Sequence, residues 1–182
     1  MQKSTITTKQ LGVTAVLLAL AVVTDFIAPV RLPYGGSLSF CTMLFICLIG
    51  YFYGVKIGVM AGVAFGLLQL MLGGYVVHPI QALLDYPLAF GALGISGFFR
   101  TRKYGLTIGY IVAVGARYLF AVLSGVVFFA AYAPPGSPVL WYSVTYNLTY
   151  ILPEMILSLI IISVPAIKHV VDKMKQQTLY QA

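Results

Sequence analysis

The chain has 182 residues, of which 60% are hydrophobic and only 8% are charged, and its formal net charge is +7. A soluble domain carries about 25% charged residues, so this composition excludes a water-soluble protein and predicts an integral membrane protein. The cations fall in short loops and tails and are not interleaved with aromatic residues, which argues against a nucleic-acid partner.

Six apolar segments predict an all-α membrane protein, with six transmembrane helices in one compact bundle that forms a single domain, residues 1–182. Proline and glycine mark several of the ends: Pro29 follows the first segment, Gly73 the third and Pro134 the fifth. In chain order the predicted ranges are 11–28, 39–52, 55–72, 79–99, 106–129 and 142–167.

With six spans, the basic residues outside the membrane gather almost entirely on one side. The opposite side carries only Arg31. Because loops rich in Lys and Arg face the cytoplasm, both termini are predicted to be cytoplasmic. The residues on that side are Lys3, Lys9, Lys56, Arg100, Arg102, Lys103, Lys168, Lys173 and Lys175.

The loops predicted on the opposite side are rich in glycine, proline and aromatic residues and poor in charge. They cover residues 31–37, 73–78 and 131–141. Aromatic residues in such loops are typical of the belt at a membrane interface. The same residues also suit lids over an outward-facing pocket, where their rings would stack on a planar ligand.

Small residues indicate where helices approach one another closely. Gly54, Gly58, Gly62 and Gly66 recur every four residues, which predicts a ridge on the third helix that packs inside the bundle. Residues 15–19 of the first helix begin and end with alanine. This small-xxx-small pair suits either internal packing or the docking of a partner subunit.

Several polar side chains lie inside the predicted spans, where an ionised group is costly and usually faces a partner or a water-filled cavity. Arg117 lies about mid-span, so Asp85 is its natural partner and Glu154 the second candidate. Helical periodicity places Asn147 and Tyr150 on one stripe with Glu154. The other polar candidates in the spans are Asp25, Gln81, Tyr86, Tyr118, Ser124, Tyr142 and Tyr146.

This polar set has two interpretations. In the first, a buried Asp–Arg pair and its Tyr and Asn neighbours only tie helices together, and the protein is a structural or assembly component of the membrane. In the second, the set lines a ligand pocket near the outer leaflet, because pockets combine apolar walls with a few convergent polar groups.

The sequence contains no motif that indicates catalysis, since HExxH, GxSxG and P-loop patterns are all missing. The protein is therefore expected not to be an enzyme, and active transport would need an ion gradient or a partner ATPase. Cys41 and Cys47 lie six residues apart, off the spacing that brings side chains together on a helix, so neither a metal site nor a disulfide is predicted.

Three stretches taken in order resemble a known family. They are residues 34–39 (YGGSLS), residues 78–86 (HPIQALLDY), and the region from Arg117 through residues 124–129 to Asn147. Together they are similar to the thiamine-specific substrate-binding (S) components of energy-coupling factor (ECF) transporters. The resemblance covers nearly the whole chain, with the same six-span layout.

The resemblance implies a multi-pass protein of the bacterial plasma membrane that binds thiamine from outside with high affinity and needs no cofactor. The S component would deliver thiamine by toppling in the lipid bilayer. A module of two ATPases and a transmembrane coupling subunit would drive this step. In the family, a small-xxx-small motif on the first helix docks the coupling subunit, and Ala15 and Ala19 match that motif.

The resemblance also implies a set of substrate-binding residues. The family's acidic residue and tyrosine on helix 4 correspond to Asp85 and Tyr86, and the basic residue on helix 5 corresponds to Arg117. The other positions that match the family's site, or lie in the matching stretches and the aromatic wall, are Tyr34, Tyr75, His78, Gly125, Phe129, Tyr142, Tyr146 and Asn147.

The chain departs from the family pattern at two places in the expected site. A histidine expected one turn after the basic residue is Ala121, and a tryptophan found in some members is Phe129. Glu154 is an additional acid with no counterpart in the pattern. An S component for another small vitamin or a thiamine precursor is therefore the alternative within transport.

Overall fold

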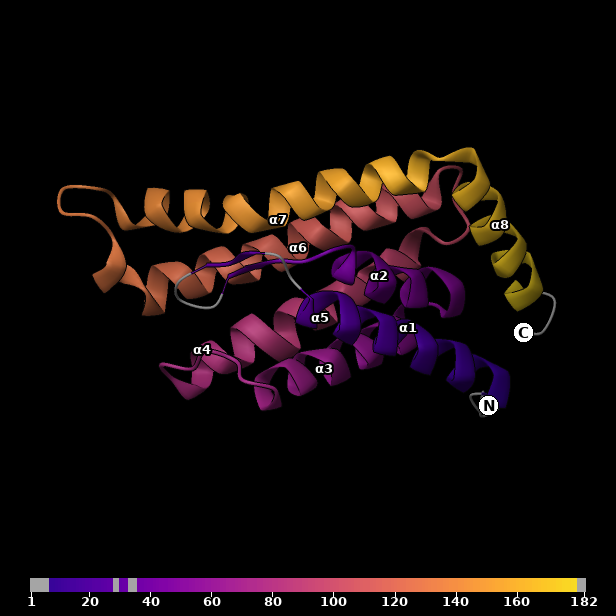
Figure 1. Cartoon of the computed structure of the whole chain (residues 1–182), viewed down its shortest axis with the longest axis horizontal. Helices are drawn as coiled ribbons and strands as arrows, with labels where there is room; N and C mark the ends of the chain where they lie inside the picture. The colour runs from indigo at the N-terminus through magenta and orange to yellow at the C-terminus, as the bar shows by residue number, and fades with distance from the viewer. Residues whose placement is uncertain (1–6, 28–29, 33–35, 180–182) are drawn as a thin grey trace.

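The structure is a computed structural model that describes residues 7–27, 30–32 and 36–179. Long helices pack side by side along one axis (Figure 1), which confirms the predicted all-α class. The elements in chain order are α1 (Thr8–Phe26), β1 (Val30–Arg31), β2 (Ser37–Leu38), α2 (Thr42–Tyr53), α3 (Val55–Met71), α4 (Pro79–Leu83), η2 (Leu84–Leu88), α5 (Ala89–Ala92), η3 (Leu93–Phe99), α6 (Gly105–Phe128), η4 (Ala130–Tyr132), α7 (Val139–Ser163) and α8 (Pro165–Leu179).

Each of the six predicted apolar segments coincides with a helix or a continuous helical stretch. Four of these are long and apolar enough to cross a membrane: Thr8–Phe26, Pro79–Phe99, Gly105–Phe128 and Val139–Ser163. The other two, α2 and α3, are apolar but shorter. That all six cross the membrane, with both termini in the cytoplasm, stays a prediction.

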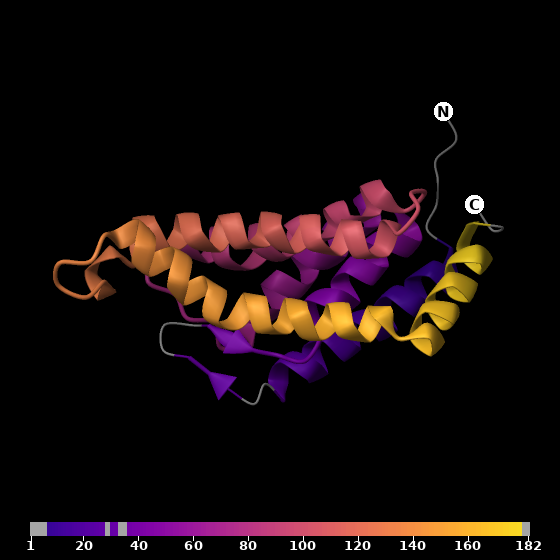
Figure 2. The ribbon, with the colours of Figure 1, turned by 90° about the horizontal axis from the view of Figure 1, so that it is seen from above.

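The last predicted segment was too long, because its final turn belongs to a separate helix. α7 ends at Ser163, and Val164 takes an extended conformation with ψ of 123°. The residue before a proline is disfavoured in the helical region, and Pro165 imposes this restriction on Val164. The chain therefore turns, and α8 crosses the end of the bundle at a steep angle to α7 in two perpendicular views (Figures 1 and 2).

The glycine ridge of α3 packs directly against the backbone of the stretch from η2 to η3, which confirms the predicted internal contact. A Cβ atom on Gly62 would lie 2.2 Å from the carbonyl oxygen of Phe90, and one on Gly66 would lie 2.4 Å from that of Tyr86. Only hydrogen at these positions permits so close an approach. Gly54, the first glycine of the series, lies in the α2–α3 turn with φ of +91°.

The fourth predicted span is a helix interrupted by a π-helical turn, η2. Pro87 lies inside this turn. A proline within a regular helix removes one hydrogen bond and clashes with the carbonyl group four residues earlier, and the wider π turn accommodates it. Turns of this kind frequently occur at functional sites. This one contains Asp85 and Tyr86, the pair at the centre of the predicted site.

α2 is short and begins inside the protein. Its 12 residues span about 18 Å at about 1.5 Å per residue, against a hydrocarbon core of about 30 Å. Its first residues, Thr42 and Met43, are buried. The N–H groups of this first turn cannot reach water, so they need partners within the protein.

Glu154 of α7 supplies such a partner. Its carboxylate accepts a hydrogen bond of 2.8 Å from the backbone N–H of Met43 and one of 2.7 Å from the hydroxyl of Ser39. A negative charge is also favourable at the positive end of the helix dipole. Glu154 therefore caps α2, a role that the sequence did not indicate.

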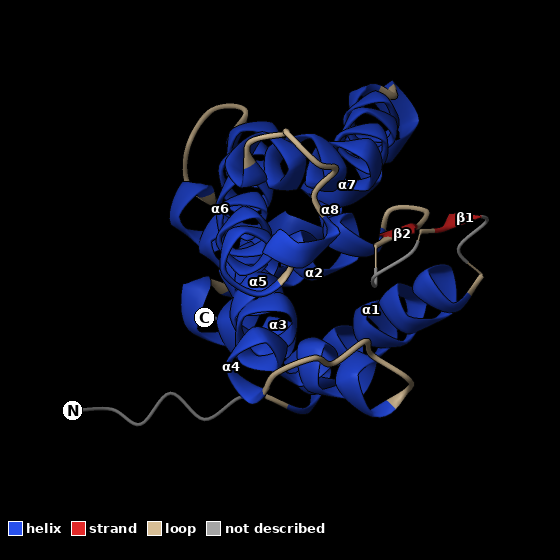
Figure 3. Ribbon diagram, turned by 90° about the vertical axis from the view of Figure 1, so that its left-hand side faces the viewer, coloured by secondary structure: helices blue, strands red, loops and turns tan. Residues whose placement is uncertain are grey.

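A short hairpin occupies the space above the start of α2. β1 and β2 pair antiparallel, with Val30 opposite Leu38 and Arg31 opposite Ser37, and the hairpin lies between α1 and α7 (Figure 3). The backbone N–H of Gly36 donates a hydrogen bond of 3.2 Å to the hydroxyl of Tyr146. The hairpin thus completes one wall of the bundle where α2 is missing.

The substitution Gly62→Ala tests the contact between α3 and α5. The added methyl group collides with the Phe90 carbonyl, and overpacking of this kind costs about 1–3 kcal/mol. We expect a lower thermal midpoint for the detergent-solubilised protein. Gly115→Ala is the matched control, because a Cβ there meets no heavy atom within 4 Å. Equal midpoints for the wild type and both variants would contradict the contact.

Candidate functional site

A cavity opens between the hairpin and the helices. The elements that line it lie toward the end of the bundle opposite to α8 (Figure 1). The cavity contains about 810 Å³ of empty space, counted out to its open side. Its lining combines aromatic, amide, hydroxyl and charged side chains: Asp25, Gly36, Ser37, Gln69, Tyr75, Gln81, Asp85, Tyr86, Ala89, Phe90, Arg117, Ala121, Ser124, Gly125, Phe129, Tyr142, Ser143, Tyr146, Asn147 and Tyr150.

Gln81 holds Asp85 and the loop before α4 in place. Its side-chain amide is buried and donates hydrogen bonds to the Asp85 carboxylate at 2.6 Å and to the Tyr75 carbonyl at 3.1 Å. Its oxygen accepts from the N–H of Val77 at 3.0 Å, and the Tyr86 hydroxyl donates to the Tyr75 carbonyl at 3.3 Å. The carboxylate is therefore fixed with respect to the loop that forms the cavity rim.

Arg117 lines the cavity but does not pair with Asp85, so that part of the prediction is wrong. The central carbon of its guanidinium lies 4.3 Å from the centroid of the Phe90 ring, where a cation is attracted by the negative face of the aromatic system. Among the described residues, Arg117 forms no ion pair with Asp85 or with Glu154, whose carboxylates bond to Gln81 and to the start of α2.

Asn147 forms the centre of the α7 wall. It is buried, donates a hydrogen bond of 2.9 Å to the Ser143 carbonyl, and accepts one from the Tyr150 hydroxyl. α6 lies close by, because a Cβ atom on Gly125 would be only 2.1 Å from the Ser143 hydroxyl oxygen. A side chain at position 125 would therefore push α6 and α7 apart and change the shape of the cavity.

Ser124 places a hydroxyl beside the cavity, near the Asp85 carboxylate. Its side chain is fully buried, it lines the cavity, and within the described part of the chain its hydroxyl forms no hydrogen bond. A buried hydroxyl left without a partner costs about 1–3 kcal/mol. A polar ligand atom at this position would recover that cost.

Aromatic rings surround the mouth of the cavity. The rings of Tyr75 and Phe129 lie 6.2 Å apart and those of Phe129 and Tyr132 lie 5.9 Å apart, and the hydroxyls of Tyr75 and Tyr132 are 3.3 Å from each other. On the α7 side, the rings of Tyr142 and Tyr146 lie 6.0 Å apart with an interplanar angle of 30°. Loops far apart in sequence thus place several flat rings around one opening.

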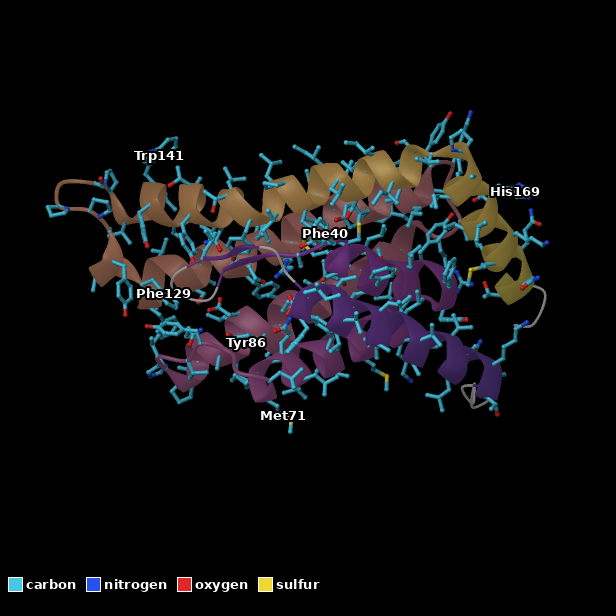
Figure 4. The ribbon with its side chains drawn as sticks, viewed as in Figure 1. Phe40, Met71, Tyr86, Phe129, Trp141 and His169 are labelled. Carbon is cyan, nitrogen blue, oxygen red and sulfur yellow. The ribbon has the colours of Figure 1, made fainter. Side chains whose placement is uncertain are left out.

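The structure brings most of the predicted site residues together. Tyr86 and Phe129, labelled in Figure 4, lie in this half of the bundle, and both line the cavity. The predicted residues in the lining are Tyr75, Asp85, Tyr86, Arg117, Gly125, Phe129, Tyr142, Tyr146 and Asn147.

Of the predicted site residues that the structure describes, His78 is not in the lining. Tyr34 lies outside the described residues. His78 caps α4, since its Nδ1 accepts a hydrogen bond of 3.2 Å from the N–H of Ile80, and its ring stacks on Phe128 at 5.1 Å. The structure thus gives His78 a local role at the start of α4 and does not bring it to the cavity.

The two alanines of the small-xxx-small pair lie on the outer surface. Ala15 and Ala19 are exposed, whereas the buried residues of α1 are Leu17 and Ala21. The neighbouring Gly12 also has open space where its side chain would be. Small residues therefore lie on an exposed face of α1.

Some lining residues were not among the predicted site residues. Asp25 was recognised as an intramembrane acid, but its position at the cavity depends on how α1 packs against the hairpin. Gln69 belongs to no motif. Ser143 stands one helical turn before Asn147, and this spacing was the one signal that could have identified it.

The arrangement would suit a small polar aromatic molecule. It has two carboxylates, Asp25 and Asp85, one guanidinium, several hydroxyls, and aromatic rings at its mouth. Among the described residues there is no group of three or more side chains that could hold a metal ion. The lining therefore offers charged groups, hydrogen-bonding groups and aromatic rings to a ligand.

Comparison with known proteins agrees with this description. Residues 11–173 match the family model described as "Thiamine transporter protein (Thia_YuaJ)". The chain is 40% identical over 164 residues to "Thiamine transporter ThiT" of Bacillus subtilis, covering 81% of this chain and 85% of that protein. It is 32% identical over 121 residues to the protein of the same name in Lacticaseibacillus paracasei, covering 57% and 60%.

A solved structure of ThiT from Listeria monocytogenes has the same fold. It superposes with a TM-score of 0.77 at 28% sequence identity, over 91% of this chain and 96% of that one. The family match extends over most of the sequence and includes all of the elements that form the cavity. This chain belongs to the thiamine transporter protein family.

Proposed function

We propose that this chain binds thiamine in the cavity between the hairpin, η2, α6 and α7, as the substrate-binding S component of an ECF transporter. The observation that carries the proposal is the cavity itself: the residues that match the family's site form one continuous lining around Asp85. The fold-wide likeness to proteins named thiamine transporters supports the same ligand.

The polar lining suits the aminopyrimidine half of thiamine. Asp85 is held by Gln81 and has acceptor capacity left for an exocyclic amino group. Asn147 both donates and accepts, and the Ser124 hydroxyl forms no hydrogen bond within the described residues. These groups can form hydrogen bonds with the donors and acceptors along the edge of a flat heterocycle, while the aromatic rings cover its faces.

The charges and rings suit the cationic thiazolium half. Stacking of a cation on a ring such as Tyr75 or Phe129 contributes about 0.5–2 kcal/mol. The lining also holds Asp25 and Asp85 against Arg117, so it carries one negative charge in excess when both acids are ionised. A ligand with one positive charge neutralises that excess.

Ala121 gives the cavity no preference for thiamine over a related molecule. It lines the cavity where the family pattern has an imidazole, so one ring contact of the family is missing and some space is gained. An S component for a thiamine precursor or another small vitamin is the second candidate. Mass spectrometry of the ligand retained by the purified protein distinguishes the two.

We further propose that the exposed face of α1 docks a transmembrane coupling subunit, which works with two ATPases. Ala15 and Ala19 lie on this face, and small residues allow close helix contact in membranes. The chain itself would then bind thiamine, and the two ATPases would hydrolyse ATP. Transport would take place in the bacterial plasma membrane, with both termini in the cytoplasm as the distribution of Lys and Arg predicts.

Replacing Asp85 by Ala tests the binding site. Loss of a buried charged partner costs about 2–5 kcal/mol, so we expect thiamine affinity to fall at least about thirtyfold in calorimetric titration. Asp172→Ala, which removes an acid from α8, is the control and should bind like the wild type. Unchanged affinity in a folded Asp85→Ala protein would refute the assignment.

Replacing Asp25 by Asn tests whether the excess negative charge recognises the thiazolium. We expect affinity for thiamine to fall about tenfold, or ~1.4 kcal/mol, while affinity for an analogue with an uncharged ring in place of the thiazolium stays the same. The comparison is made by competition titration. An equal loss for both ligands would mean that Asp25 acts on the shape of the cavity and not on its charge.

Replacing Ala15 by Trp tests the docking face. The bulky ring should prevent close helix contact, so we expect the variant to bind thiamine normally but to fail to co-purify with the coupling subunit and ATPases. Leu119→Trp adds a ring at an exposed position of α6 and should leave assembly intact. Normal assembly of the Ala15→Trp protein would place the interface elsewhere.

A further inference from the structure

A second hollow lies at the opposite end of the bundle from the thiamine cavity, where α6 begins and α7 ends. It contains about 1210 Å³ of empty space, counted out to its open side. It is formed by the end of α2, the turn before α6, the last turn of α7 and one face of α8. We call it the basic groove, and its lining is Tyr51, Arg102, Lys103, Tyr104, Gly105, Leu106, Thr107, Ile162, Ser163, Ile167, Lys168, Val171, Asp172 and Lys175.

The basic groove carries uncompensated positive charge. Its lining has four cations, Arg102, Lys103, Lys168 and Lys175, and one acid, Asp172, which leaves a net charge of +3. The whole sequence has only four acidic residues. Two of the other three line the thiamine cavity and the third caps α2, so none of them can balance the groove.

Aromatic rings contact the three lysines of the groove. The ammonium nitrogens of Lys103 and Lys168 lie 5.4 Å and 5.6 Å from the centroid of the same Tyr104 ring. Lys175 lies 4.5 Å from the Tyr51 ring and donates a hydrogen bond of 2.9 Å to its hydroxyl. Two like charges on one ring repel each other, and an anion between them would remove the repulsion.

The first turn of α6 adds to the positive potential. Gly105, Leu106 and Thr107 line the groove, and among the described residues no side chain caps this helix start. The N–H groups of an uncapped first turn favour a nearby anion. Here the helix end acts together with the four cations and does not form the site alone.

The groove lies at the depth of lipid headgroups. α6 has 24 residues, about 36 Å at about 1.5 Å per residue, so its ends reach both membrane interfaces. α8 crosses the end of the bundle (Figures 1 and 2). It exposes Ile167 and Val170 beside its lysines, as expected of a helix that lies in the interface plane.

We propose that the basic groove binds the phosphate group of an anionic phospholipid, with α8 lying in the headgroup region. Basic pockets at helix ends recognise such headgroups through several ammonium and guanidinium groups at once. A lipid fits better than a free anion, because apolar residues of α8 continue the surface toward the acyl chains. The proposal does not depend on which ligand occupies the other cavity.

Native mass spectrometry of the detergent-solubilised chain tests the proposal, with phosphatidylglycerol and phosphatidylcholine of equal acyl length as probes. The wild type should retain phosphatidylglycerol preferentially. In Lys103→Gln/Lys168→Gln, affinity for that lipid should fall about thirtyfold, since each cation contributes about fivefold. Lys103→Arg/Lys168→Arg, which keeps both charges, should retain the lipid.

The matched control is Lys56→Gln/Lys173→Gln, which removes the same charge at the same end of the bundle but outside the groove. It should retain phosphatidylglycerol like the wild type. Equal losses in both Gln pairs would overturn the proposal, because net charge alone would explain the binding. Binding of inorganic phosphate as tight as that of the lipid would also overturn the proposal, because the groove would then be a site for a free anion. So would a groove variant that binds the lipid normally but loses the coupling subunit, because the groove would then be a protein-docking site.

Discussion

The close contact between α3 and the stretch from η2 to η3 is the constraint on which the site depends. Glycines let the two backbones touch, and this contact fixes the depth and rotation of the π-helical turn. This π-helical turn places Asp85 and Tyr86 at the cavity, where Gln81 holds the Asp85 carboxylate by a hydrogen bond. A bilayer provides no hydrophobic force between helices, so such close packing is what gives the site a defined shape.

The sequence predicted the helical segments well, because apolar length and proline or glycine at the ends are strong signals in a membrane protein. It missed α8, since a polar segment with three lysines and one acid resembles a solvated tail. It missed the hairpin, whose strands have two residues each. It also gave no sign that α2 begins inside the protein, because the cap, Glu154, comes from a helix more than a hundred residues later.

For the site, family resemblance located residues that line one cavity only in the folded chain, such as Tyr75 and Asn147. Charge pairing was predicted less well. Arg117 and Asp85 share the cavity, but an aromatic face and a neighbouring amide satisfy them separately. Opposite charges on two predicted spans suggest an ion pair. The local contacts that compete with it, here with Phe90 and Gln81, depend on the three-dimensional structure.

The replacement of a helical wall by the hairpin has a thermodynamic consequence. A transmembrane helix satisfies its backbone within itself, so its order is independent of its neighbours. The hairpin relies on bonds that reach other elements, such as that from Gly36 to the Tyr146 hydroxyl, and Tyr146 also lines the cavity. Tyr146 therefore contributes both to the order of the hairpin and to the lining of the cavity. By linkage, if order in the hairpin raises the ligand affinity of the cavity by some factor, a bound ligand favours the ordered hairpin by the same factor.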